Sequence, residues 1–370
     1  MSHDIEPALT GMAPPDRQRI QAWSELIRQA AACGQPLRLE GSGSKAFYGR
    51  STVGTPVALA AHAGILDYEP SELVLRARGG TPLAAVQRLL AGSGQMLAFE
   101  PPHFGPHATL GGCVAAGLSG PRRASAGGLR DFLLGVRMLD GQGRVLSFGG
   151  QVMKNVAGYD VARLMAGSLG TLGILLDVSL KVLPLPPGER SLCLEMGQVQ
   201  ALSHLHRLGM RPLPLTASAW VDGRLVLRLS GAAQALRQAA AELGGETLAP
   251  DQADAFWQSL REQRPPVFAE DTRPLWRLSL PATAPALALP GREVIEWGGA
   301  LRWYQGPAEP AVLCDRARAL GGHVQCFRGH EDGPLAFARP PTVQLALMRR
   351  LKQVFDPAGI LNPGRFYPEL

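Results

Sequence analysis

Three glycine-rich segments in the first half of the chain could bind a phosphate-bearing ligand. The first glycine segment, residues 41–46, reads Gly-Ser-Gly-Ser-Lys-Ala and follows a predicted strand over 36–40. Its glycines let the backbone approach an anion closely and point successive N–H groups at it. Ser42, Ser44 and the Lys45 cation can add to that binding. We therefore predict phosphate binding here, with an ordinary surface turn as the alternative.

The same segment matches the dinucleotide fingerprint G-x-G-x-x-G/A, but the residues after it exclude a Rossmann site. Such a site requires a long helix directly after the loop, so that the helix N-terminus meets the pyrophosphate. Here Phe47-Tyr48-Gly49-Arg50 follows, and then Gly54 and Pro56, which leave no room for that helix. The sequence therefore predicts a phosphate-binding loop outside a Rossmann fold.

Two further glycine segments make a shared ligand site the better explanation. The second glycine segment, residues 109–117 (Thr-Leu-Gly-Gly-Cys-Val-Ala-Ala-Gly), has small side chains that let a flat ligand lie against the backbone. Close packing between two elements would use the same residues. The third glycine segment, residues 167–174 (Gly-Ser-Leu-Gly-Thr-Leu-Gly-Ile), indicates a backbone free of side chains on one side, and Gly167 can end a preceding helix. Three such segments are hard to explain by turns alone.

Composition excludes several other classes of function. The chain has 370 residues and a formal net charge of +6, but its basic residues are dispersed and form no block with interleaved aromatics. This argues against nucleic-acid binding, while a mild positive field suits an anionic ligand. The five cysteines are odd in number and none are at Cys-x-x-Cys spacing, so we expect no disulfide framework, no metal site and no iron–sulfur cluster of its own.

The expected location follows from what the sequence lacks. The N-terminus has no charged-then-apolar signal pattern, and no uninterrupted apolar stretch approaches the length of a transmembrane helix. We therefore expect a cytoplasmic protein without a membrane span.

Hydrophobic periodicity places these segments among strands and helices. We predict helices over 16–33, from Thr81 as N-cap to about 90, and from Asp160 to Gly167. Strands are predicted near 57–60 and 72–78, and a hairpin joins 136–139 to 144–148. The stretch 174–182 alternates cleanly and predicts a half-buried strand, with Asp177, Ser179 and Lys181 on its solvent face.

The second half shows a different rhythm after the proline-rich residues 184–188, which are the best candidate boundary. Two rounds of strands and helices follow. The first round has strands at 191–196, 216–221 and 224–229 and helices at 198–208 and 232–243. The second has a strand at 275–280, a hairpin through 298–299, a helix near 311–320 and a strand at 323–327. This pattern predicts an antiparallel sheet covered by helices on one face, ferredoxin-like in character. A last helix is predicted over 342–355.

The glycine segments, in this order and spacing, resemble the FAD-binding half of the vanillyl-alcohol oxidase superfamily, also named the PCMH-type FAD domain. More narrowly, longer strings resemble the E-subunit family of bacterial glycolate oxidases, which are glycolate dehydrogenases; these strings are residues 43–50, 120–123, 149–160, 297–303 and 362–365. The resemblance implies an α+β fold: a two-part PCMH-type FAD-binding domain over 1–183, a ferredoxin-like cap domain over 190–335 of the FAD-linked oxidase C-terminal type, and a C-terminal helix and tail over 340–370 that pack back on the FAD domain.

The resemblance also implies which residues bind FAD. The first glycine segment would wrap the pyrophosphate, the second would line the flavin and pyrophosphate, and the third would lie against the adenine side, with the backbone of Ile174 available for a hydrogen bond. Some relatives attach the flavin covalently through a His in the first loop; this chain has none there, so we expect dissociable FAD. The predicted cofactor-binding residues are Gly41, Ser42, Gly43, Ser44, Lys45, Thr109, Leu110, Gly111, Gly112, Gly117, Ser119, Gly170, Thr171, Gly173 and Ile174.

One departure from the family bears on the chemistry. Relatives that oxidise hydroxy acids carry a His-x-Gly-Asp-Gly-Asn-x-His string late in the chain, which supplies a base and often metal ligands. Here His323 and His330 reproduce neither that spacing nor its core. The sequence therefore assigns no catalytic residue.

Three functions remain open. The first is an FAD-bearing subunit of a glycolate dehydrogenase complex, whose partners would be a catalytic FAD subunit and an iron–sulfur subunit, with peripheral contact to the inner membrane through the complex. The second is a stand-alone 2-hydroxy-acid dehydrogenase, with Arg122, Arg123 or Arg302 for the carboxylate and His323 or His330 as base. The third is a structural subunit that has lost its flavin.

Overall fold

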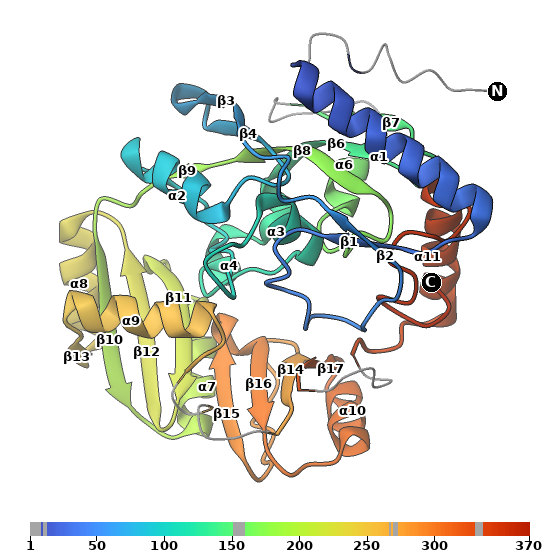
Figure 1. Ribbon diagram of the computed structural model, residues 1–370. Helices are drawn as coiled ribbons and strands as arrows, with labels where there is room; N and C mark the ends of the chain where they lie inside the picture. The colour runs from blue at the N-terminus through green and yellow to red at the C-terminus, as the bar shows by residue number, and fades with distance from the viewer. Residues whose placement is uncertain (1–8, 10–12, 151–159, 266–267, 269–272, 330–335) are drawn as a thin grey trace.

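A computed structural model describes residue 9, residues 13–150, 160–265, 268, 273–329 and 336–370. Residues 151–159, which belong to one of the strings that carry the resemblance, and His330 lie outside the described residues. Figure 1 shows two bodies of mixed helices and strands, the first built mainly by the N-terminal half and the second by the C-terminal half.

The first half is organised around a five-stranded antiparallel sheet. Its strands are β3 (Ile65–Glu69), β4 (Val74–Arg78), β6 (Leu133–Leu139), β7 (Val145–Gly149) and β8 (Ile174–Lys181), in the order β3-β4-β8-β6-β7. A separate parallel pair joins β1 (Leu37–Glu40) to β2 (Thr55–Ala58). The predicted hairpin is confirmed as β6 and β7, and the predicted strands near 36–40 and 72–78 as β1 and β4.

Strand β8 corrects one prediction, because both of its faces are buried. It lies between β4 and β6, and it contributes to two separate hydrophobic clusters. Helix α1 (Pro14–Cys33) covers one of them with Ile20 and Ile27, next to Leu176 of β8. Asp177, predicted on a solvent face, is buried and ion-paired with Arg76 and Arg137. The alternation of apolar and polar residues was therefore that of a central strand with two buried sides, rather than of a strand with one side in solvent.

The helices of the first half are short after α1. They are α2 (Leu83–Gly92), α3 (Leu110–Ala116), α4 (Arg123–Ala126), α5 (Leu129–Phe132) and α6 (Val161–Leu164). Thr81 does not cap α2: Pro82 occupies the N-cap position, while the Thr81 hydroxyl donates to the carbonyls of Gly64 and Arg78. Asp160 does cap α6, because its carboxylate accepts from the N–H of Arg163.

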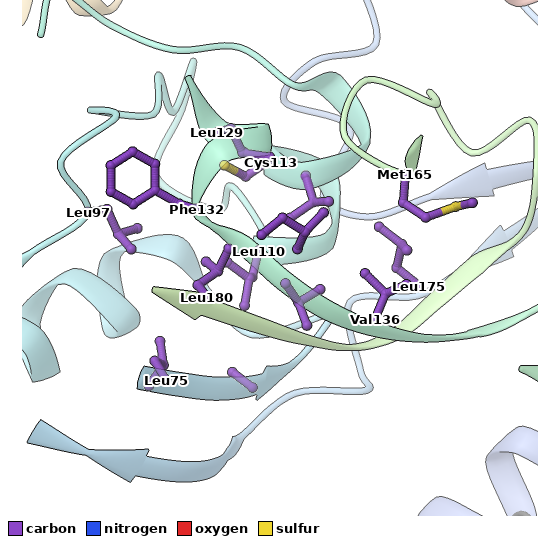
Figure 2. Packing of buried hydrophobic residues seen from close by; sticks show 14 of the residues in the cluster. Leu75, Leu97, Leu110, Cys113, Leu129, Phe132, Val136, Met165, Leu175 and Leu180 are labelled. Atoms are coloured by element: carbon purple, nitrogen blue, oxygen red, sulfur yellow. The ribbon is translucent and has the colours of Figure 1, made fainter. Parts of the chain in front are cut away.

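The second glycine segment is a helix rather than a loop. Thr109 caps α3, and Leu110 and Cys113 point into the core that α3 forms with β6 and β8 (Figure 2). Burial of a side chain such as Leu110 stabilises the fold by about 1.5–3 kcal/mol. The small residues on the rest of α3 are left free to face another element or a ligand.

The second half contains one eight-stranded antiparallel sheet in the order β13-β10-β12-β11-β15-β16-β14-β17. The strands are β10 (Glu189–Glu195), β11 (Leu215–Val221), β12 (Arg224–Ser230), β13 (Glu246–Thr247), β14 (Leu275–Ser279), β15 (Arg292–Glu296), β16 (Leu301–Gln305) and β17 (His323–Arg328). This confirms the predicted antiparallel sheet. The limits of the three predicted domains stay a prediction, although the first sheet ends at Lys181 and the second begins at Glu189.

Helices cover this sheet largely as predicted. Helices α7 (Gln198–Gly209), α8 (Ala233–Leu243) and α10 (Pro310–Ala319) each form a hydrophobic cluster with one face of the sheet. The other face packs on α9 (Pro250–Arg261), which the sequence did not predict, and on residues of the first half. The functional site must be sought between this face and the first half.

The C-terminal segment returns to the first half. Helix α11 (Thr342–Phe355) ends with Phe355 in the main core of that half, and Leu361 then pairs with Leu37 beside β1. Figure 1 shows α11 on the same side of the molecule as α1 and β2. Among the described residues, no helix is long and apolar enough to cross a membrane.

Candidate functional site

The three glycine segments surround one continuous space. A cavity of about 260 Å³ is lined by residues 41–46 together with Thr109, Gly112 and Leu169. A smaller cavity of about 90 Å³ shares several of these residues and continues along Gly111, Gly170 and Gly173. The structure thus brings together most of the residues that the sequence predicted for the cofactor.

The first glycine segment presents backbone donors to the larger cavity. Its turn is closed by the N–H of Ala46, which donates to the carbonyl of Gly43, a residue at φ 74° where glycine is favoured. Within the described part of the chain, the N–H groups of residues 41–45 donate to no protein acceptor. A row of such donors around a cavity is suited to an anion.

Lys45 adds a positive charge beside these donors. Its Nζ donates to the carbonyl of His103 at 3.2 Å and lies 5.6 Å from the centre of the Phe104 ring. Burial lowers the pKa of Lys45, while the charges of Cys113 and Glu262 oppose that shift. A phosphate that reached the cavity would meet both the backbone donors and this cation.

Helix α3 contributes a surface of small residues rather than free N–H groups. The N–H of Gly111 donates to the carbonyl of Gly79 at 2.6 Å, and that of Gly112 to the Thr109 hydroxyl at 3.2 Å. A Cβ on Gly111 would lie 2.9 Å from the Gly79 oxygen, so this glycine is required by packing. Gly112 faces the two cavities instead, and its hypothetical Cβ meets only the Thr109 hydroxyl within 4 Å.

The remaining predicted residues are distributed between cavity and core. Gly117 and Ser119 line a third cavity of about 210 Å³, next to the larger one. Leu110, Thr171 and Ile174 are buried and line none of the three cavities. Their side chains support the walls, and the Thr171 hydroxyl donates to the carbonyl of Ser168 at 2.7 Å.

Two C-terminal residues complete the walls, and sequence reasoning did not assign them to the site. Asn362 accepts from the N–H of Leu39 at 2.8 Å and donates to the carbonyl of Leu169 at 2.7 Å. Arg365 donates to the carbonyls of Lys45, Ala46 and Tyr48, and thereby holds the first glycine segment. The Asn-Pro-Gly-Arg string at 362–365 was the sequence signal that could have identified these two residues, but only the fold shows which segments they contact.

Lys352 of α11 supports the same walls from behind. Its Nζ donates to the carbonyls of Thr171 and Leu361 and to the carboxylate of Asp356, all within 2.9 Å. Burial lowers the pKa of Lys352, while the charge of Asp356 opposes that shift. The third glycine segment is therefore fixed by a buried ion pair from the C-terminal helix.

The third cavity lies where the two halves meet. Tyr48 lines it, and the Tyr48 hydroxyl accepts from the side-chain amide of Gln325 on β17 at 3.4 Å. Trp297, which follows β15, donates from its indole N–H to the carbonyl of Gly120 at 3.1 Å. The second sheet therefore contacts Tyr48 in the wall of the third cavity through Gln325, and Trp297 beside that sheet contacts Gly120 of the first half.

The structure distinguishes among the candidate carboxylate-binding arginines. Arg302 has no exposed surface and donates to the carbonyls of Ala284 and Gly299, so it is a structural residue. Arg122 is buried and paired with Glu189. Arg123 lines the third cavity and lies 4.4 Å from the ring of Trp297.

The candidate bases receive less support. His323 is exposed at the start of the edge strand β17, and His330 lies outside the described residues. The sequence did not mark one buried carboxyl of the second sheet: Glu296, the last residue of β15, accepts from the indole N–H of Trp303 at 2.7 Å. Burial raises the pKa of Glu296 to about 7, against the hydrogen bond from Trp303 and the charge of Arg277.

Comparison with known proteins decides the family. A family model described as an FAD binding domain matches residues 18–149, and one for the C-terminal domain of FAD linked oxidases matches residues 340–366. Over 350 residues the chain is 46% identical to glycolate oxidase subunit GlcE of Escherichia coli K12, across 95% of this chain and 98% of that protein. The chain belongs to the FAD-linked oxidase family.

More distant relatives of this FAD-linked oxidase are similar mainly in part of the chain. Glycolate oxidase subunit GlcD of Bacillus subtilis is 30% identical over 173 residues, which cover 45% of this chain and 37% of that protein. A solved structure of alkyldihydroxyacetonephosphate synthase superposes with a TM-score of 0.64 at 15% identity, over 92% of this chain and 74% of that one. The superposition confirms the predicted fold class, and the family confirms FAD as the cofactor.

Proposed function

We propose that this chain is the FAD-carrying subunit of a glycolate-oxidising complex and that it holds the cofactor in the space between its three glycine segments. The observation that carries the proposal is the row of N–H groups over residues 41–45: these groups have no protein acceptor among the described residues, and the residues that carry them line the larger cavity. The identity to GlcE along nearly the whole chain supports the same assignment.

Each part of the site has a separate task in cofactor binding. The first glycine segment and Lys45 would hold the pyrophosphate, since backbone donors and a cation suit its charge. The small residues of α3 would let the cofactor lie flat against the helix, and Asn362 would keep the first and third segments at a fixed distance. When bound, FAD would supply the acceptor for the hydride, and with it the two electrons, that oxidation removes from a hydroxy acid.

The cofactor is proposed to be dissociable. Covalent attachment of a flavin needs a side chain such as His or Cys at the site. Among the described residues that line the three cavities, there is neither a His nor a Cys. The nearest thiol, Cys113, is buried in the core, and burial raises its pKa to about 11.

Partner subunits would complete the reaction. GlcE is named as a subunit, and we infer that this chain works with a catalytic FAD subunit and with an iron–sulfur subunit that carries electrons onward. All five cysteines are free thiols spread over the fold, so a partner must supply any cluster. Free thiols also fit a reducing cytoplasm, with contact to a membrane only through the complex.

The test compares the isolated chain with the chain purified together with its partners from the native host. The isolated chain should bind FAD and reduce a dye with glycolate slowly or not at all, whereas the complex should reduce the dye rapidly. High glycolate oxidation by the isolated, FAD-loaded chain would overturn the accessory role and favour the stand-alone dehydrogenase. A structural subunit without flavin would stay colourless after reconstitution with FAD.

One specific observation favours the second candidate function, a stand-alone 2-hydroxy-acid dehydrogenase. Arg123 provides a cation in the third cavity, and Glu296 provides a buried carboxyl on the second sheet; oxidation of a hydroxy acid could use groups of these two kinds.

A further inference from the structure

We propose that Arg123 and Arg277, which flank the indole of Trp297 where the two halves meet, bind the carboxylate of a small 2-hydroxy or 2-oxo acid. The substrate class rests on the proposed function, whereas the anion site is argued from the side chains themselves. If the proposed function holds, this chain both carries the flavin and binds the acid directly.

The two arginines come from different halves of the fold. Arg123 belongs to α4 and lies 4.4 Å from the centre of the Trp297 ring; Arg277 belongs to β14 and lies 5.5 Å from the same ring. Burial lowers the pKa of Arg123, and the charge of Arg277 adds to that shift while the charge of Asp131 opposes it. Two cations are thus held beside one indole.

Arg277 has no anion to balance its charge. In the described structure it forms no hydrogen bond and no ion pair, and its Nε is buried without a partner. Three other arginines of the same interface or sheet differ: Arg122, Arg228 and Arg302 each pair with a glutamate. The rest of the side chain of Arg277 is half-buried. A partly desolvated cation without a counterion favours an added anion at this position.

The third cavity is lined by Arg123 and Arg130, though not by Arg277, and its charge suits an anion. None of its described lining residues carries a carboxylate; Asp131, which is not among them, acts on the charge of Arg123. The nearest acid on the facing sheet, Glu296, is within reach of the charge of Arg277 but does not form an ion pair with it. Arg277 is instead flanked along the sheet by Trp303 and Gln325.

The surroundings favour a small carboxylic acid. A guanidinium offers a planar fork that matches a carboxylate, and the rings of Trp297 and Trp303 bound the space around Arg277 with flat apolar walls. The hydrogen-bonded pair of Tyr48 and Gln325 lies at the same meeting of the halves and supplies polar atoms for a neighbouring hydroxyl or carbonyl. A cavity of about 210 Å³ accommodates such an acid.

The experiment measures binding rather than turnover. The full chain, prepared with and without FAD, is titrated with oxalate and with glycolate, and binding is followed by calorimetry and by tryptophan fluorescence. Glycolamide, which lacks the charge, serves as the ligand control. The variants are R123M, R277M and R277K, and R318M is the matched control because Arg318 is 77% exposed on α10, on the other face of the sheet.

We expect oxalate to bind the wild-type chain, glycolamide to bind much more weakly, and R123M or R277M to lose about tenfold or more in affinity, as truncation of a paired buried charge does. R277K should retain part of the affinity, and R318M should match the wild type. FAD content and the melting temperature of each variant show that it is folded and loaded.

Two results separate this proposal from the proposed function. If the FAD-loaded wild type binds no oxalate, or if R277M binds it as tightly as the wild type, the carboxylate site is refuted and the FAD assignment stands. If the chain binds oxalate in an Arg277-dependent way but never takes up FAD, the carboxylate site is supported and the proposed function is refuted.

Discussion

The side chain of Asn362 donates from Nδ2 to the carbonyl of Leu169 at 2.7 Å, across 193 residues of sequence. Its Oδ1 accepts from the N–H of Leu39 at 2.8 Å. One buried amide therefore joins the strand before the first glycine segment to the third glycine segment, and it lines both cavities of the cofactor site. The distance between the walls of the site is set by a residue near the C-terminus.

Replacement of Asn362 by Gly should loosen cofactor binding more than it destabilises the fold. Asn362 has φ 42°, a conformation that Gly adopts without strain, so the substitution removes only the side chain. Leaving the Leu39 N–H and the Leu169 carbonyl without partners costs about 1–3 kcal/mol, and we expect FAD to bind about tenfold more weakly or worse. Fluorescence titration with FAD measures this; N362D, which keeps the acceptor, should lie between. Unchanged affinity in N362G would show that the amide does not shape the site.

Two neighbouring glycines of α3 should respond differently to the same substitution. In G112L a side chain would enter the cavities, so FAD retention should be lost while the apoprotein melts within a few degrees of the wild type. In G111L the side chain would collide with the backbone of Gly79, so the apoprotein itself should be destabilised, as overpacking by about 1–3 kcal/mol or more does.

Melting curves of both apoproteins and the ratio of flavin to protein absorbance distinguish these outcomes. If G112L retained full flavin, the cavity along α3 would not be the cofactor site.

Replacement of Lys352 by Met should destabilise the whole fold. The change leaves the carboxylate of Asp356 buried without its cation, and it removes hydrogen bonds to the carbonyls of Thr171 and Leu361. Breaking a buried ion pair in this way costs about 3–5 kcal/mol. Urea denaturation of the apoprotein measures the loss, and R350M, an exposed change on the same helix, should have little effect. Equal unfolding midpoints for the two variants would count against a buried ion pair at this position.

Glu296 should make stability depend on pH in a defined direction. The folded protein keeps the Glu296 proton up to a pH near 7, whereas a glutamate in the unfolded chain loses it near 4.5. The folded state therefore binds more protons in this window, and the free energy of unfolding falls as pH rises from about 4.5 to about 7. The groups that act on this carboxyl are Trp303, Arg277, Arg228 and Glu100.

The matched variant is Glu296→Gln, which imitates the protonated side chain and still accepts from Trp303. Its melting temperature should match the wild type near pH 5 and exceed it at pH 8 by about 2 °C or more. Parallel melting curves across this range would mean that Glu296 is ionised in the folded state throughout.

Local patterns in the sequence were sufficient for most of the helices and strands and for the first glycine segment. Residues 41–46 combine glycines, hydroxyls and a cation in six positions, so their chemistry is readable without the fold. The absence of a long helix after them is confirmed, since a turn follows instead. Strand β3 was missed because its residues are largely exposed. Helix α9 was also missed, although Ala253, Phe256, Trp257 and Leu260 are at helical spacing.

Side chains that act across the fold could not be predicted in this way. Asn362 and Lys352 reach the cavity walls only because the C-terminal segment returns to β1. Arg277 and Arg123 meet at the same indole only because the second sheet faces α4. Gly111 shows two roles at once: it lines the smaller cavity, as predicted for a ligand-binding residue, and its close contact with Gly79 also requires a glycine for packing. Sequence motifs indicate the class of ligand, and tertiary contacts determine which residues lie at its binding site.

The most direct test of the cofactor site is the flavin content of the purified full chain after reconstitution with FAD and removal of excess cofactor. We predict a visible flavin spectrum, one FAD per chain, and complete release of the flavin on acid precipitation, with G112L treated in parallel and remaining colourless. A wild-type chain that stays colourless, or a G112L chain with the same flavin content as the wild type, would contradict a dissociable FAD held between the three glycine segments.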